Sequence, residues 1–140
     1  MRESELKRGM FCRVVGSMIV IRQNKETSSD QDWDDFLDML VEHRANFASL
    51  KILVVTDGGG PSQPQRKRLE VALDGKPVRV AVVSDSMKTR FIVSSIALLN
   101  RDMSSFRASE MTQAYEHLGL TFDERRVAKT TIQELSPRIR

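Results

Sequence analysis

Apolar residues along the chain alternate between a strand-like and a helix-like spacing. Residues 11–15 and 18–22 are short apolar runs separated by Gly16 and Ser17, which predicts an antiparallel hairpin with a type II′ turn. Residues 51–56 and 78–83 are continuous runs rich in Val and Ile, typical of central strands covered on both faces. Residues 103–106 are expected to form a short edge strand.

Between these runs, apolar residues recur at intervals of three and four, as they do on one face of a helix. A first helix is predicted over residues 30–47, with Ser29 as its N-cap. Its apolar stripe is expected to contain Trp33, Phe36, Leu37, Leu40, Val41, Arg44 and Phe47. The acidic residues at its start are explained by the positive end of the helix dipole rather than by a metal site.

Four later segments also carry helix signals. A capping box, Ser62-x-x-Gln65, opens a helix that runs to Leu73. Asp85 or Ser86 caps the next helix, whose inner face is expected to contain Phe91, Ile92, Ile96 and Leu99. Residues 109–118 form a helix that stops at Gly119. Residues 121–135 are predicted to be helical, although their apolar positions fit no period well.

The resulting order, β-β-α-β-α-β-α-β-α and a tail, predicts an α/β fold. Its sheet is mostly parallel and is opened by the hairpin, with helices packed on it. Residues 1–9 are interpreted as an N-terminal extension, residues 10–120 as the domain, and residues 121–140 as a C-terminal extension that is helical.

Composition narrows the classes of function. The chain has 140 residues, with 22 basic and 19 acidic side chains mixed along most of its length, so no nucleic-acid partner is expected. Cys12 is the single cysteine, which excludes an internal disulfide and gives no metal-ligand spacing. No apolar stretch is long enough to insert into a membrane. We expect a cytoplasmic protein with no metal and no cofactor.

Signatures of catalysis and nucleotide binding are missing. His43 and His117 have no nucleophile or metal ligand at a useful spacing, so no enzyme is predicted. The three glycines after Asp57 do not form a P-loop, because no Gly-Lys-Ser/Thr follows them. They also lack the last glycine of the Gly-x-Gly-x-x-Gly pattern that binds dinucleotides. A receiver domain is also rejected, because the acidic pair that holds its magnesium has no counterpart near Gly16.

Several motifs together resemble the STAS fold of anti-sigma-factor antagonists, and more closely a group of proteins described as STAS/SEC14-like. The resemblance covers residues 10–120 and rests on residues 52–57, Pro64-x-Arg66-x-Arg68, residues 80–85, Met87-x-x-Arg90, Phe106 and residues 117–120. It implies a non-enzymatic regulatory module that binds a protein. Asp57 matches the aspartate before the family's phosphorylated hydroxyl, but glycines stand where that hydroxyl is expected.

In an open parallel sheet, ligands bind at the carboxyl ends of the strands. The sequence therefore predicts a binding rim at the glycine loop and at the starts of the two helices that follow it. The predicted binding residues are Asp57, Gly58, Gly59, Gly60, Ser62, Arg66, Arg68, Lys88 and Arg90. An acidic protein surface or a phosphate group would suit these cations.

Two functions follow from this prediction. The first is a STAS-like module for protein–protein interaction, in which a homodimer is also plausible. The second is a carrier or sensor that binds a nucleotide, a phosphate ester or a lipid near the same edge. An apolar cavity would favour the second function.

Overall fold

The computed structural model describes residues 8–98 and 100–139, and within them five strands form one sheet in the order β1-β2-β3-β4-β5. The strands are β1 (Met10–Val15), β2 (Met18–Gln23), β3 (Lys51–Thr56), β4 (Arg79–Val83) and β5 (Met103–Phe106). β1 is antiparallel to β2, and the other neighbouring strands are parallel. The predicted α/β class and its mostly parallel sheet are confirmed.

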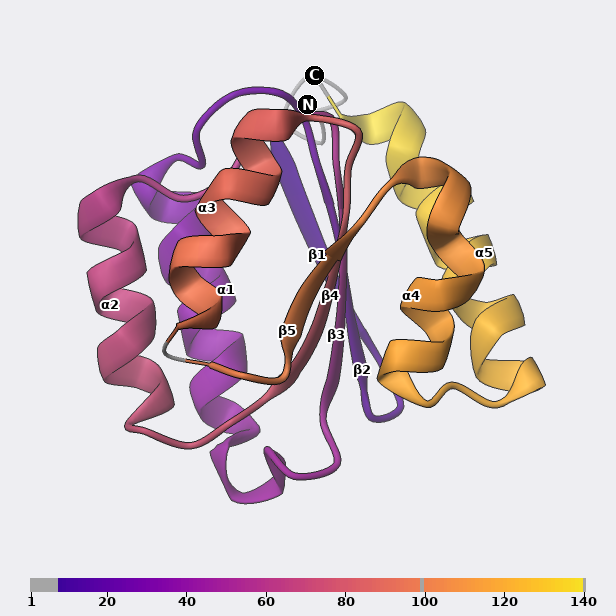
Figure 1. Cartoon of the computed structure of the whole chain (residues 1–140), viewed down its shortest axis with the longest axis horizontal. Helices are drawn as coiled ribbons and strands as arrows, with labels where there is room; N and C mark the ends of the chain where they lie inside the picture. The colour runs from indigo at the N-terminus through magenta and orange to yellow at the C-terminus, as the bar shows by residue number, and fades with distance from the viewer. Residues whose placement is uncertain (1–7, 99, 140) are drawn as a thin grey trace, which may run out of the picture.

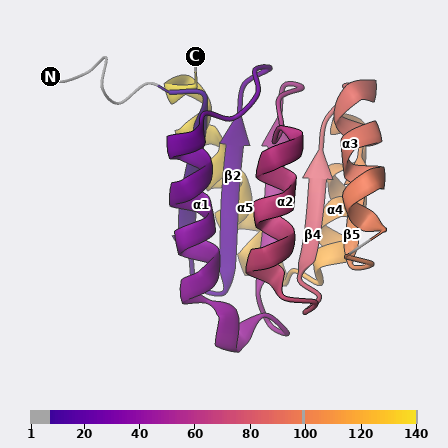
Figure 2. The ribbon, with the colours of Figure 1, turned by 90° about the vertical axis from the view of Figure 1, so that its left-hand side faces the viewer.

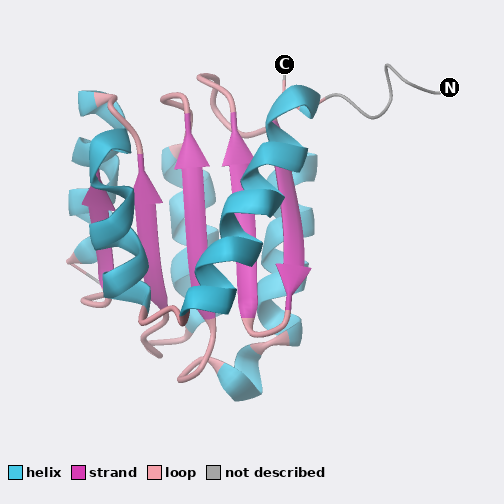
Figure 3. Cartoon of the chain, turned by 90° about the vertical axis from the view of Figure 1, so that its right-hand side faces the viewer, coloured by secondary structure: helices cyan, strands magenta, loops and turns pink. Residues whose placement is uncertain are grey.

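The opening hairpin has the predicted two-residue turn. Val15 pairs with Met18 across it, and Gly16 adopts a φ of 60°. Ser17 is not among the described non-glycine residues with positive φ, so the turn matches type II′ rather than type I′. β1 consequently runs opposite to the other strands, as Figure 3 shows at the edge of the sheet.

Helices cover both faces of the sheet. α1 (Asp30–Glu42), α2 (Gln63–Leu73) and α3 (Met87–Ala97) lie on one face, and α4 (Met111–Leu118) and α5 (Phe122–Leu135) lie on the other (Figure 1). From β2 to β5, each strand lies on the same side of the strand that precedes it in the sequence. Because each connection between these parallel strands is right-handed, the connecting helices α1, α2 and α3 all lie on one face of the sheet. After β5 the chain returns across the opposite face.

Alternation along the strands divides the core into two layers. Ile52 and Val80 pack under α1, α2 and α3, whereas their neighbours Leu53 and Ala81 pack under α4 and α5. Both sets are buried, which explains why the central strands are continuously apolar in the sequence.

α1 differs from its prediction at its C-terminal end. Ser29 caps it as predicted, but the helix ends at Glu42, and a 3₁₀ turn (Arg44–Asn46) follows. Phe47 is still buried, because that turn directs it back into the core. Val41 is exposed, since it lies about 100° around the helix from the buried Leu40.

The predicted inner face of α3 is partly wrong. Ser86 caps the helix and Ile96 is buried as expected, but Phe91 is 77% exposed. Thr89 and Val93 take the inner positions. The physical reason is that the Thr89 hydroxyl donates a hydrogen bond to the Gly58 carbonyl at 2.9 Å, which turns a polar residue inward. Leu99, also predicted to face inward, lies outside the described residues.

The remaining boundaries agree closely with the sequence. The Ser62–Gln65 capping box opens α2, which ends at Leu73 as predicted, and Gly119 stops α4. α4 begins at Met111, after a 3₁₀ turn (Ala108–Glu110).

α5 confirms the predicted C-terminal helix and forms part of the core. It opens with the Thr121–Glu124 capping box. Its buried residues are Ala128, Thr131 and Leu135. Because two of these three are small or polar, the inward face of the helix does not appear as an apolar stripe in the sequence. Phe122 points outward instead. Residues 1–7 of the predicted N-terminal extension lie outside the described residues.

Candidate ligand-binding site

The glycine loop after β3 is held closely by other parts of the chain. The Gly58 N–H donates to the Thr56 hydroxyl at 3.1 Å, and that hydroxyl donates to the Gly59 carbonyl at 2.8 Å. The Gly59 N–H donates to the Asn24 carbonyl at 2.9 Å. These two amides are therefore already paired within the protein and do not form a free cradle for an anion.

Close packing explains why glycine occupies position 59. A Cβ there would lie 2.0 Å from the Glu26 carbonyl oxygen and 2.6 Å from the Asn24 carbonyl oxygen. Only a residue without a side chain lets the two loops approach so closely. The Ser28 N–H adds a hydrogen bond to the Gly60 carbonyl at 3.1 Å. The loop thus joins the start of α1 to the end of β3.

Several charged residues of the predicted rim already have partners within the protein. Asp57 pairs with Arg22 at 2.9 Å, and Arg68 pairs with Asp34 of α1. The Arg66 guanidinium donates to the Pro61 carbonyl at 3.2 Å.

The other rim residues have different surroundings. The Ser62 side chain accepts the Gln65 N–H of the capping box. Lys88 and Arg90 lie in the first turn of α3, and no described residue accepts a hydrogen bond from either side chain. Of the predicted cations, those on α3 and Arg66 thus remain available to a ligand or partner.

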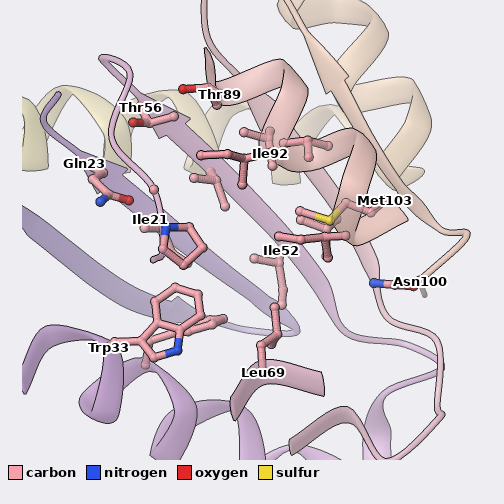
Figure 4. A pocket seen from close by; sticks show the side chains of 18 of the residues that line it. Ile21, Gln23, Trp33, Ile52, Thr56, Leu69, Thr89, Ile92, Asn100 and Met103 are labelled. Carbon is pink, nitrogen blue, oxygen red and sulfur yellow. The ribbon is translucent and has the colours of Figure 1, made fainter. Parts of the chain in front are cut away.

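A cavity of about 90 Å³, which no sequence pattern predicted, lies between the sheet and the layer formed by α1, α2 and α3 (Figure 4). Its walls are mostly aliphatic and aromatic. Examples are Ile21, Ile52 and Val82 from the strands, Trp33 from α1, Leu69 from α2 and Ile92 from α3. Part of the predicted rim reaches it, because Gly59, Gly60 and Pro61 also line it.

Polar side chains in the cavity wall already have partners in the protein. Gln23 donates to the Ser28 hydroxyl at 2.8 Å, and Thr89 donates to the Gly58 carbonyl. Asn100 donates to the Val78 carbonyl at 2.9 Å. The Thr56 hydroxyl is engaged within the glycine loop, as described above. The surface offered to a bound molecule is consequently apolar.

An empty apolar cavity of this size destabilises a protein. Interiors normally pack with few voids larger than a water molecule. At about 24 cal/mol per Å³, a void of 90 Å³ costs about 2 kcal/mol. A ligand that fills it recovers the lost contacts.

The titratable residues that the structure describes outside this site show no metal-binding cluster. In the described part of the chain, no three His, Cys, Asp or Glu side chains lie close enough to share a metal ion. His43 contacts the Met39 carbonyl and His117 contacts the Asp102 carbonyl. Burial raises the pKa of the Cys12 thiol to about 12, and the carboxylate of Asp32 adds to the rise.

Two further findings bear on the expected classes of protein. No helix within residues 8–98 and 100–139 combines the length and the apolar composition needed to cross a bilayer. Comparisons of the chain with protein-family models, curated proteins and solved structures found no match.

Proposed function

We propose that this protein binds a small apolar molecule, or the apolar part of a larger one, as a carrier or sensor. The observation that supports the proposal is the cavity beneath α1, α2 and α3, whose polar wall groups are already hydrogen-bonded within the protein. Small-ligand sites in proteins are lined predominantly by hydrophobic and aromatic side chains, as this cavity is.

The size of the cavity limits what it can hold. An engineered apolar cavity of about 150 Å³ is large enough to bind benzene. The cavity here, at about 90 Å³, suits a thin alkyl chain better than a ring system. Each methylene that enters it contributes about 0.8 kcal/mol, or roughly a fourfold gain in affinity.

Trp33 provides a direct test. It is the single tryptophan of the chain and lines the cavity. A bromine atom quenches indole fluorescence on contact, so 8-bromooctan-1-ol is a neutral probe whose tail reports its arrival beside Trp33. We expect saturable quenching.

A variant with a filled cavity provides the control for this titration. Val80→Ile with Val82→Ile adds a methyl group at two wall positions, and we expect it to weaken the quenching at least about fourfold. Quenching that rises linearly with probe concentration, equally in both proteins, would show collision only and would overturn the proposal.

The second candidate function is the regulatory interaction module implied by the STAS resemblance. A different observation favours it: α3 exposes Met87 and Phe91, with Lys88 and Arg90 between them in the sequence, and its C-cap residue Leu98 is exposed as well. Exposed apolar side chains flanked by cations suit a partner protein whose surface carries acidic groups.

Photo-crosslinking inside the cell of origin tests this second candidate. A photoreactive residue at Phe91 is compared with one at Val71 of α2, which is similarly exposed at 76%. We expect an adduct at position 91 that disappears with Lys88→Glu and Arg90→Glu. Equal labelling at both positions would exclude a partner on α3, and an adduct of twice the chain mass would identify a second copy instead.

A further inference from the structure

α2 and α3 lie next to each other on the same face of the sheet (Figure 2). A second hollow lies on the surface between these two helices. It has a volume of about 230 Å³, and α2 supplies most of its lining. Gln63, Arg66, Lys67 and Glu70 follow one another along that side of α2, and Ser95 faces them from α3. Unlike the internal cavity, this groove has charged side chains in its lining.

The groove and the cavity share part of their walls. Leu69 and Leu73 of α2 and Ile96 of α3 line both. These three side chains therefore form the partition between the surface groove and the apolar interior. A molecule that passes between them has one end in each compartment.

Positive charge predominates at the groove. Arg66 uses one guanidinium nitrogen for the Pro61 carbonyl, which leaves further N–H donors of its fork for a ligand. Lys67 is exposed, and no described residue accepts a hydrogen bond from it. Lys88 lies two helical turns before Ser95 and so on the same side of α3. Among the described residues that line the groove, Glu70 supplies the opposing charge.

We infer that the ligand is an anionic amphiphile. Its alkyl chain occupies the cavity, and its carboxylate or phosphate head lies in the groove on Arg66 and Lys67. The inference rests on the proposed function, since the tail site is the cavity itself. It adds the chemical class of the ligand and the position of its head.

Two probes with the same tail separate the inference from the proposed function. 8-Bromooctanoate and 8-bromooctan-1-ol differ only in the head, and both report on Trp33 through the bromine. At low salt, the wild-type protein is expected to bind the carboxylate about tenfold more tightly than the alcohol, and added salt reduces the difference. Octyl phosphate, measured by competition, shows whether a phosphate head is preferred to a carboxylate.

Variants at the head site complete the test. Arg66→Gln with Lys67→Gln is expected to abolish the preference for the carboxylate while leaving the affinity for the alcohol unchanged. Lys129→Gln with Arg138→Gln removes two exposed charges elsewhere on the chain and is expected to change neither affinity.

Each outcome has a distinct meaning. If both probes bind equally to the wild type and to the groove variant, the cavity binds apolar ligands but the head site is refuted. If neither probe quenches Trp33 saturably, the proposed function fails together with the inference. A preference for the carboxylate that survives in the groove variant also overturns the assignment of Arg66 and Lys67.

Discussion

The indole N–H of Trp33 donates a hydrogen bond to the backbone carbonyl of Gln65 at 2.9 Å, which joins α1 to the first turn of α2. The same ring forms one wall of the apolar cavity. α1 and α2 are therefore held together at the side chain that a bound ligand would touch.

Trp33→Phe is expected to lower the free energy of unfolding by about 2 kcal/mol, because it removes the buried indole donor from the Gln65 carbonyl and replaces a buried ring system with a smaller one. Urea denaturation followed by circular dichroism measures the loss. Tyr115→Phe, in α4 on the other face of the sheet, is the control and should change stability little. Equal stability of the two variants would show that the Trp33 bond contributes nothing.

Neighbouring residues of β4 test whether the cavity is a real packing defect. Val82 lines it, whereas Val83 is buried in the packed layer under α4 and α5. We expect Val82→Ile to stabilise the fold by up to about 0.8 kcal/mol and Val83→Ile to destabilise it by about 1–3 kcal/mol. Thermal denaturation measures whether each variant is more or less stable than the wild type. A loss of stability in both variants would show that no unfilled space lies beside Val82.

Gly59→Ala should be far more damaging than Gly60→Ala. The new methyl group at position 59 meets two carbonyl oxygens, but at position 60 its nearest neighbour is the Ile92 side chain at 3.9 Å. We expect Gly59→Ala to cost about 3 kcal/mol, and Gly60→Ala to stay within about 1 kcal/mol of the wild type. Similar chemical denaturation midpoints would mean that the two loops do not pack as described.

Acid should weaken the start of α5 through Glu124. The Thr121 backbone N–H lowers the pKa of this carboxyl, burial opposes the shift, and Lys51 adds to the lowering. A lowered pKa in the folded state stabilises the fold above the ordinary value of 4.5, and this stabilisation is lost as the pH falls through the folded value.

Glu124→Gln keeps the capping box but removes the charge. We expect it to cost about 0.5 kcal/mol near neutral pH, with the difference from the wild type shrinking in acid. Urea titrations at several pH values test this expectation, with the exposed Glu116→Gln as the control. If the difference in stability between the wild type and Glu124→Gln grew toward low pH, the pKa of Glu124 would be raised rather than lowered in the folded protein.

Cys12 should be a slow nucleophile in the folded protein. Raising its pKa from 9.0 to about 12 lowers the thiolate population about a thousandfold at neutral pH. Alkylation by iodoacetamide should therefore be slower than for free cysteine by a similar factor, and should reach the ordinary rate in urea. Rapid alkylation of the folded chain would contradict this.

Local signals in the sequence predicted most of the fold. The turn at Gly16, the N-cap at Ser29 and the capping boxes at Ser62 and Thr121 all depend on residues a few positions apart. Their geometry is decided by nearby backbone and side-chain hydrogen bonds, so it can be read from short stretches of chain. The order of strands and helices then determined the α/β class.

Predictions failed where contacts between distant segments decided the outcome. Thr89 faces inward because it bonds Gly58, 31 residues away, and this leaves Phe91 exposed. Arg68 is paired with Asp34 on a neighbouring helix, so one cation of the predicted rim already has a partner in the protein. The sequence pattern contains no information about either partner.

By itself, the sequence determined the elements, their caps and their order, because those depend on local backbone preferences and hydrophobic spacing. Only the tertiary structure decided that α2 and α3 leave a groove between them and a cavity beneath them. An unfilled volume depends on how side chains from several elements meet across the sheet, and no single segment of the chain specifies that.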